Sequence, residues 1–173
     1  AERYPVLYLV SGTTDTEETW FKVGRVDRIL DNLIAEKRAV PMIVAMPYGN
    51  MMKGTPPPNS PQAADMYQLF SDELTKTIMP FVEATYRTRN DRVARAIAGF
   101  SRGGGQSLFT GFLNADKFAW IGSYSAYLTP AVMEQRFPGI VGDPGGTNGK
   151  LKLLWLGVGK EDFLYNDARV FDE

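Results

Sequence analysis

The chain has 173 residues, of which 44% are hydrophobic, 12% aromatic and 23% charged, and its formal net charge is −1. This length suits one domain with a sizeable core, and the composition is that of a globular protein. The near-neutral charge argues against nucleic acid or an anionic membrane as a partner. The sequence holds no cysteine and no histidine, which excludes disulfides, thiolate or imidazole metal sites, a cysteine nucleophile and an imidazole base within these residues.

The chain shows no membrane span, because no apolar run approaches the ~20 residues that a spanning helix needs. No signal peptide precedes the strand-like run at Tyr4, which is what we expect either of a mature secreted protein or of an excised part of a longer one. The basic cluster Arg87, Arg89, Arg92 and Arg95 lacks interleaved aromatic residues. We therefore expect it to cap a helix end and to be solvated at a strand entry rather than to bind nucleic acid.

Five short apolar runs, most of them followed by turn residues, predict strands. They are Tyr4–Val10, Pro41–Met46, Arg92–Ala98, Phe118–Ser123 and Leu151–Gly157. The first two are nearly all apolar, which is typical of strands buried on both faces of a parallel sheet.

Three segments with helical periodicity lie between these strands. They are Val26–Glu36, with a continuous apolar stripe, Ala63–Tyr86, which Pro80 should kink or divide, and Gln106–Leu113. The proline-rich run Gly54–Pro61 predicts a surface loop. Strands that alternate with helices predict one α/β domain, with a mostly parallel sheet and helices on both faces.

The third strand leads into Gly99-Phe100-Ser101-Arg102-Gly103, which matches the pattern G-x-S-x-G. In a sharp strand-to-helix turn, this pattern places a serine hydroxyl at the carboxyl end of the sheet beside a helix N-terminus. Glycines flank the serine because a side chain there would collide with the neighbouring strand or helix. The context predicts that Ser101 is a nucleophile on such an elbow; the alternative is an ordinary glycine-rich turn.

A serine nucleophile needs a base, and in this class of fold an acid and then a histidine follow it along the chain. Asp162 comes just after the fifth strand and is the predicted acid, with Glu161 as the alternative. Asp143, Asp167 and Asp172 fit less well because they lie away from the end of that strand. No histidine follows, and Lys160 could act as a base only if it were desolvated.

An oxyanion hole needs two backbone N–H donors. One is predicted at Arg102, the residue after the nucleophile, and the second at Thr13, in the loop Ser11-Gly12-Thr13 that follows the first strand. Aromatic side chains in neighbouring loops should line the cleft at this edge of the sheet. Trp20, Tyr48 and Phe163 are the predicted substrate-binding residues. No metal or other cofactor is expected.

Several segments together resemble the esterase branch of the α/β-hydrolases that includes carbohydrate esterase family 1. They are Tyr4–Gly12, Trp20, Ile29–Ala35, Met42–Asn50, Arg95–Gly104 and Gly157–Asp162. Feruloyl and acetyl xylan esterases belong to this family, and S-formylglutathione hydrolases, enterochelin esterases and mycolyltransferases are its relatives. The resemblance extends from Tyr4 to Glu173 and implies the same roles for Ser101, Asp162, Arg102 and Thr13.

The resemblance also shows three departures. The family usually has His-Gly where this chain has Ser11-Gly12, and commonly Met where this chain has Arg102. Its catalytic histidine lies farther past the acid than Glu173, and it has strands ahead of the Tyr4–Pro5 run. The resemblance therefore implies a hydrolase domain truncated at both ends.

The implied function is a secreted serine carboxylesterase that hydrolyses a feruloyl or acetyl ester on xylan through an acyl-enzyme on Ser101. Its partner would be a small-molecule or polysaccharide ester. Three alternatives remain open: a non-catalytic relative that binds a carbohydrate or aromatic ester, an acyltransferase, and an esterase similar to S-formylglutathione hydrolase. A cytoplasmic location is the alternative to secretion. The sequence does not define the oligomeric state.

Overall fold

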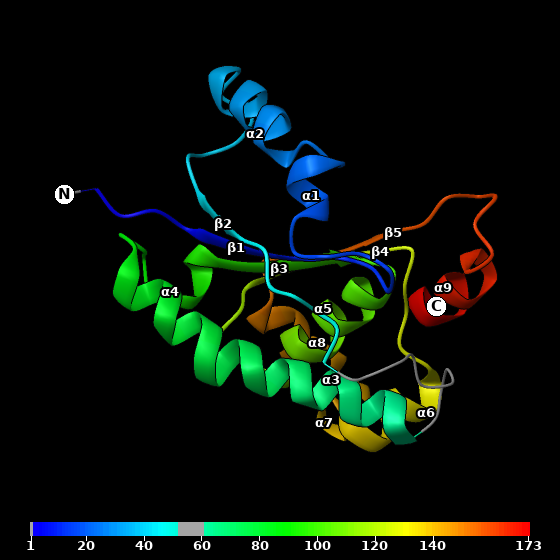
Figure 1. Ribbon diagram of the computed structural model, residues 1–173. Helices are drawn as coiled ribbons and strands as arrows, with labels where there is room; N and C mark the ends of the chain where they lie inside the picture. The colour runs from blue at the N-terminus through cyan, green and yellow to red at the C-terminus, as the bar shows by residue number, and fades with distance from the viewer. Residues whose placement is uncertain (1, 52–60) are drawn as a thin grey trace.

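The computed structural model describes residues 2–51 and 61–173 (Figure 1). Its centre is a five-stranded sheet in the order β2-β1-β3-β4-β5, in which every neighbouring pair is parallel. The strands are β1 (Val6–Val10), β2 (Ile43–Ala45), β3 (Arg95–Phe100), β4 (Trp120–Tyr124) and β5 (Leu153–Gly157). The predicted α/β class and all five strands are thus confirmed. Residues 54–60 of the predicted proline-rich loop lie outside the described residues.

The helices form two unequal layers. The elements are α1 (Thr19–Lys22), α2 (Val26–Ala35), α3 (Pro61–Glu73), the π-helical turn η1 (Leu74–Ile78), α4 (Met79–Thr85), the 3-10 turn η2 (Arg92–Ala94), α5 (Arg102–Leu113), α6 (Pro130–Arg136), α7 (Pro138–Gly142), α8 (Pro144–Lys150) and α9 (Tyr165–Asp172). In Figure 1, α3 to α8 cover one face of the sheet and α1 and α2 lie over the other, while α9 sits beside the carboxyl ends of the strands.

The core lies between the sheet and the helices α3 and α5. Tyr8 of β1 packs edge-on against Phe118, with ring centroids 6.0 Å apart, and Phe109 of α5 packs against Phe137 at 5.2 Å. All four rings are buried. Burial of each such side chain contributes about 1.5–3 kcal/mol, so this face of the sheet supplies most of the stability.

The opposite face is covered much less. The helix predicted at Val26–Glu36 is present as α2, but no residue of α2 is buried and Ile29 is 52% exposed. The segment Pro41–Met46 was predicted to be a buried strand, yet β2 is only partly buried because it forms one edge of the sheet. The predicted burial of this strand is therefore wrong.

The long predicted helix Ala63–Tyr86 is continuous but contains a π-helical turn. Pro80 has no N–H to donate, so the usual i→i−4 ladder cannot run through it. Within the turn, the N–H of Met79 donates to Leu74 O, five residues back, and α4 then carries Pro80 in its first turn. The predicted irregularity is confirmed, and it takes the form of one widened turn before the proline.

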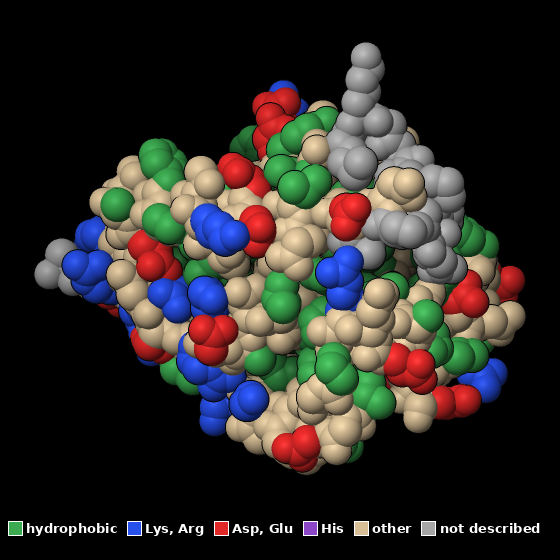
Figure 2. Space-filling view, turned by 90° about the horizontal axis from the view of Figure 1, so that it is seen from below, with side chains coloured by type: hydrophobic (Ala, Val, Ile, Leu, Met, Phe, Trp, Pro, Cys, Tyr) green, Lys and Arg blue, Asp and Glu red, His purple; other side chains and the backbone are tan. Residues whose placement is uncertain are grey.

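Acidic and basic side chains are interspersed on the face of the molecule seen in Figure 2. Three of the four arginines of the basic cluster make polar side-chain contacts in the described part of the chain. Arg89 pairs with Asp91, Arg95 pairs with Glu83 at 2.6 Å, and Arg92 donates to Ala115 O. These local contacts fit the predicted role of the cluster at the strand entry.

Candidate active site

Ser101 lies on a sharp turn between β3 and α5. The strand ends at Phe100 and the helix begins at Arg102, so Ser101 alone makes the turn, with φ 55° and ψ −124°. Its N–H donates to Tyr124 O (2.8 Å) and its carbonyl accepts from the N–H of Gly105 (3.1 Å). Few non-glycine residues adopt a positive φ, and such residues cluster at functional sites. The predicted strand-to-helix turn is confirmed, while the role of Ser101 stays a prediction.

Glycines permit the close crossing of strand and helix at this turn. A Cβ on Gly103 would lie 2.5 Å from Val10 O and 2.6 Å from Ser11 O, and a Cβ on Gly99 would meet the backbone of Gly103. Only glycine fits at these two positions. The helix starts at Arg102 rather than at the predicted Gln106, because the three glycines are packed inside its first turn instead of forming a loop.

The loop predicted to carry the second oxyanion donor lies against this elbow. It follows β1, which is the neighbour of β3 in the sheet. A Cβ placed on Gly12 would lie 3.5 Å from Ser101 Cβ and 3.3 Å from the Phe100 ring. The Gly12 N–H donates to Asp15 Oδ2 (2.8 Å), which tightens the turn. Ser101 and this loop are thus neighbours, as the sequence predicted, although the role of Thr13 as a donor is still a prediction.

Asp162 follows β5 at the same edge of the sheet. Its Oδ1 accepts from the N–H of Leu164 (2.9 Å), and its own N–H donates to Gly159 O (3.0 Å). The hydrogen bond from Leu164, followed by one from the Ser125 hydroxyl, lowers the pKa of Asp162 below its ordinary value. A lowered pKa keeps the carboxylate charged near neutral pH, which suits an acid that orients a base.

The loop after β5 that carries Asp162 is called the acid loop below. Ser125 connects this loop with the elbow and was not predicted from the sequence. It has φ 49° and directly follows Tyr124, the residue whose carbonyl accepts from Ser101 N–H. Its N–H donates to Gly157 O (2.7 Å) at the end of β5. A serine at the carboxyl end of β4 was the available signal, because the ends of neighbouring parallel strands meet at one edge.

The other carboxylates considered for the acid have local environments of their own. Glu161 is exposed, and Asp143 caps α8 by accepting from Gly146 N–H. Asp167 lies in α9 and forms a hydrogen bond with the Tyr127 hydroxyl, and Asp172 ends that helix. Lys160 is exposed, so the desolvation that a lysine base requires is not met.

The three predicted substrate-binding aromatics have different surroundings. Tyr48 is half-exposed in the loop after β2, and that loop is held by Gln106 of α5, whose Nε2 donates to Gly49 O (2.7 Å). Trp20 was predicted in a loop but belongs to the short helix α1, where its ring packs against Gly24. Phe163 is 89% exposed beside Asp162. Substrate contact by each of these residues is still a prediction.

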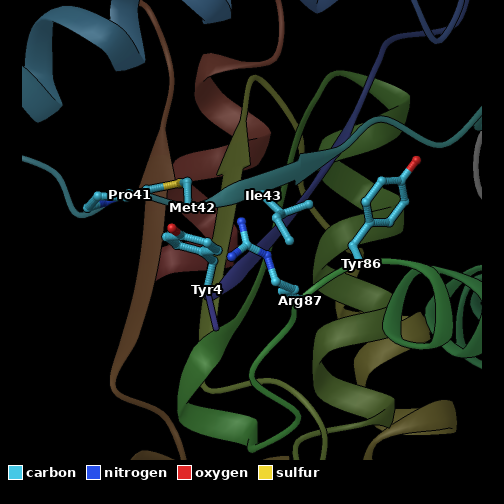
Figure 3. Close-up of a pocket in the computed structure, with 6 residues that line it drawn as sticks. All are labelled: Tyr4, Pro41, Met42, Ile43, Tyr86 and Arg87. Carbon is cyan, nitrogen blue, oxygen red and sulfur yellow. The ribbon is translucent and has the colours of Figure 1, made fainter. Parts of the chain in front are cut away.

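A separate hollow of about 400 Å³ lies at the amino ends of β1 and β2, whereas Ser101 lies at the carboxyl ends of the strands. Figure 3 shows Tyr4 and Arg87 facing each other in it, with Pro41, Met42, Ile43 and Tyr86 around them. The Arg87 guanidinium lies 5.5 Å from the centroid of the Tyr4 ring, a cation–π contact. This hollow contributes no residue to the elbow or to the acid loop.

Within residues 2–51 and 61–173, no group of three or more acidic, histidine or cysteine residues is arranged to hold a metal ion. In the same part of the chain, none of the helices combines the length and the apolar character needed to cross a bilayer.

The parallel sheet and the serine elbow define an α/β-hydrolase fold. The family model described as "Putative esterase" matches residues 1–173, so the chain belongs to this esterase family.

Individual relatives agree with this assignment. The chain is 31% identical over 128 residues to an endo-1,4-beta-xylanase/feruloyl esterase of Xylanibacter ruminicola, covering 72% of this chain but 17% of that protein. It is 29% identical to a CE1 ferulic acid esterase of Anaeromyces mucronatus solved in complex with ferulic acid, with a TM-score of 0.66, covering 74% of this chain and 48% of the other.

A third relative shows the fold alone. A mutant of the feruloyl esterase module from Clostridium thermocellum, complexed with sinapinate, superposes with a TM-score of 0.76 at 23% identity, covering 97% of this chain and 60% of the other. The chain therefore spans less than two thirds of each of these three relatives.

Proposed function

We propose that this protein is a serine carboxylesterase of the feruloyl-esterase type, which cleaves a feruloyl or acetyl ester on plant cell-wall xylan through an acyl-enzyme on Ser101. The observation that carries the proposal is the backbone of Ser101, with φ 55° at the N-terminus of the 12-residue helix α5. This strained geometry holds the hydroxyl at the carboxyl edge of the sheet, next to backbone N–H groups that favour a developing negative charge.

In the proposed reaction, Ser101 Oγ attacks the ester carbonyl and its proton passes to a general base. The carbonyl oxygen becomes an oxyanion that accepts from the N–H groups of Arg102 and Thr13. The alcohol leaves with a proton from the base, and water then hydrolyses the acyl-enzyme by the same steps. Asp162 orients the base and stabilises its charged form. Because the 173 residues contain no histidine, we place the base outside them.

Three observations support an aromatic ester of a polysaccharide as the substrate. The curated relative combines xylanase and feruloyl esterase in its name, and the related CE1 structure holds ferulic acid. In this chain, Tyr48 lies half-exposed in a loop held by α5 and offers a ring on which an aromatic acyl group could stack. Action on a cell-wall polymer requires secretion, which we include in the proposal.

The test uses the protein encoded by the complete gene and, in parallel, the 173-residue chain. An alkyl fluorophosphonate should label Ser101 in the complete gene product, and Ser101→Ala should abolish both labelling and hydrolysis of methyl ferulate. Ser107→Ala is the matched control, since this buried serine of the same helix donates to Gly103 O and takes no part in the reaction. Labelling that persists in Ser101→Ala would refute the proposal.

The absence of histidine favours one second candidate, a relative that binds a carbohydrate or aromatic ester without cleaving it. The same experiment separates the two. If the complete gene product binds ferulate esters but neither reacts with the fluorophosphonate nor releases ferulate, the binding function holds. The 173-residue chain itself should hydrolyse esters only weakly, because it lacks the base that activates Ser101.

A further inference from the structure

The side chain of Arg102 reaches from α5 to the loop after β1. Its Nη2 donates to Gly12 O (2.7 Å) and its Nη1 donates to Thr13 O (3.0 Å). The residue is only 8% exposed although it carries a charge. Arg102 is therefore connected with the predicted oxyanion hole in two ways. Its backbone N–H is one predicted donor, and its guanidinium binds the loop that carries Thr13, the second predicted donor.

The bond to Gly12 O also fixes the direction of the Thr13 N–H. The two groups belong to the same peptide unit, which is planar and trans, so the carbonyl and the N–H point in opposite directions. A guanidinium that holds the Gly12 carbonyl on one side therefore turns the Thr13 N–H to the other. The Asp15 carboxylate holds the Gly12 N–H in turn (2.8 Å), which fixes the peptide unit before it.

The two predicted donors are left available by this arrangement. Among the described residues, neither the Thr13 N–H nor the Arg102 N–H donates to another protein group. In addition, a carbonyl that accepts from a charged donor is polarised, which strengthens the N–H of the same peptide as a donor. The guanidinium thus improves both the direction and the strength of the Thr13 N–H.

A purely structural role explains the burial of Arg102 less well. Burying a guanidinium costs free energy unless its N–H groups are satisfied, and the N–H at Nε has no acceptor among the described residues. Burial accordingly lowers the pKa of Arg102, and electrostatic attraction to Tyr48, Asp15 and Tyr67 opposes this. Arg95, by comparison, is partly buried against the carboxylate of Glu83, which compensates its charge directly.

We propose that the Arg102 side chain is a positioning residue of the esterase, which holds the Gly12–Thr13 peptide so that the Thr13 N–H faces the oxyanion formed at Ser101. The proposal rests on the proposed function. Loss of the guanidinium should weaken a contact made to the oxyanion but not to the ground-state ester. It should therefore lower kcat and leave KM nearly unchanged.

The experiment compares Arg102→Met, Arg102→Lys and Arg102→Ala in the protein encoded by the complete gene, with kcat and KM measured separately on an aryl ester. Removing one oxyanion donor costs roughly 10²–10³ in kcat, so a misdirected donor in Arg102→Met should cost about 10²-fold. Arg102→Lys should recover part of the loss, and millimolar guanidinium should raise the kcat of Arg102→Ala but not that of Ser101→Ala.

Arg95→Met is the matched control, because it also removes a partly buried guanidinium but lies at the amino end of β3. It should lower the melting temperature and leave kcat unchanged. An unchanged kcat in Arg102→Met, an equal loss in Arg95→Met, or a rise in KM without a fall in kcat would each overturn the positioning role while leaving the esterase intact. A wild-type protein without Ser101-dependent hydrolysis would refute both.

Discussion

Ser101 and Asp162 follow two strands of the same sheet, but the chain around them differs in packing. All residues from Arg102 to Phe112 are buried, and the elbow closes on the backbone of β1 through Gly103. By contrast, Lys160, Glu161 and Phe163 are exposed, and the Asp162 carboxylate is held by Leu164 N–H and the Ser125 hydroxyl.

This difference separates two properties of the site. The position of the nucleophile depends on the packing of α5 against the sheet, so a change there alters the stability of the whole domain. The position of the acid depends on a few local hydrogen bonds at the surface, so a change there should alter activity with little effect on folding.

The largest expected effect is on activity, at the acid. In the protein encoded by the complete gene, Asp162→Asn should lower kcat on an aryl ester by roughly 10⁴-fold, because the base loses the group that orients it and stabilises its charge. The free energy of unfolding, from urea titration, should change by less than about 0.5 kcal/mol because the site is at the surface.

Glu161→Gln is the matched control at the neighbouring exposed position, and it should keep full activity. If Glu161→Gln loses the activity and Asp162→Asn keeps it, the acid is Glu161. If both keep it, neither residue is the acid, and the contrast between elbow and acid loop has no bearing on catalysis.

The next effect is on stability, at the elbow. A methyl group on Gly103 would press against the carbonyl oxygens of Val10 and Ser11, at 2.5 and 2.6 Å. Since both atoms belong to the backbone of the β1 segment, they cannot move aside cheaply, and Gly103→Ala should destabilise the fold by about 3 kcal/mol.

Gly149→Ala provides the comparison for this change. Gly149 lies in the helix α8 with no atom within 4 Å of its virtual Cβ. Alanine there should be neutral or stabilise the helix by up to about 1 kcal/mol. Equal urea midpoints for the two variants would show that the elbow is not closely packed.

The sequence was sufficient for the sheet and for the elbow because both depend on local patterns. Apolar runs, most of them followed by turn residues, predicted the five strands. The two glycines that flank Ser101 predicted that strand and helix approach each other closely, as they do in the structure. Burial was predicted less well. The stripe of α2 reports amphipathicity, but which surface a helix meets is decided by tertiary structure.

In the site, too, features that follow from local sequence patterns were predicted, and contacts that depend on tertiary structure were not. Ser101, Arg102 and the Ser11–Thr13 loop were predicted together because each directly follows a strand of the sheet, and the structure brings them together. The side-chain contact from Arg102 to Gly12 O joins residues 90 positions apart, and the Ser125 contact to Asp162 depends on the course of a loop. Neither contact could be predicted from a pattern in the sequence.

A smaller effect should reveal the strain stored at the elbow. Ser101 has a positive φ, which costs of order 1–3 kcal/mol for a residue other than glycine. Ser101→Gly relieves this cost and Ser101→Ala keeps it. We expect Ser101→Gly to be more stable than Ser101→Ala by about 1 kcal/mol after the entropy of glycine in the unfolded chain is subtracted. A glycine variant that is less stable would show that the turn is not strained.

The smallest effect should appear in the titration of Asp162. Its pKa is lowered by the Leu164 N–H and the Ser125 hydroxyl, so Ser125→Ala should raise the pKa of Asp162 toward the ordinary aspartate value of about 3.9. A lowered pKa in the folded state stabilises the protein above that ordinary value, and this contribution disappears as the pH falls through the folded-state pKa.

The wild type should therefore exceed Ser125→Ala in stability at neutral pH, and the part of this difference that comes from Asp162 should vanish in acid. Carbon-13 NMR of the Asp162 carboxyl group measures the shift directly. Ser125 has φ 49°, so Ser125→Gly is needed as a second variant that removes the hydroxyl without backbone strain. If the pKa of Asp162 moves in neither variant, the acid loop is positioned by its own backbone alone and is independent of β4.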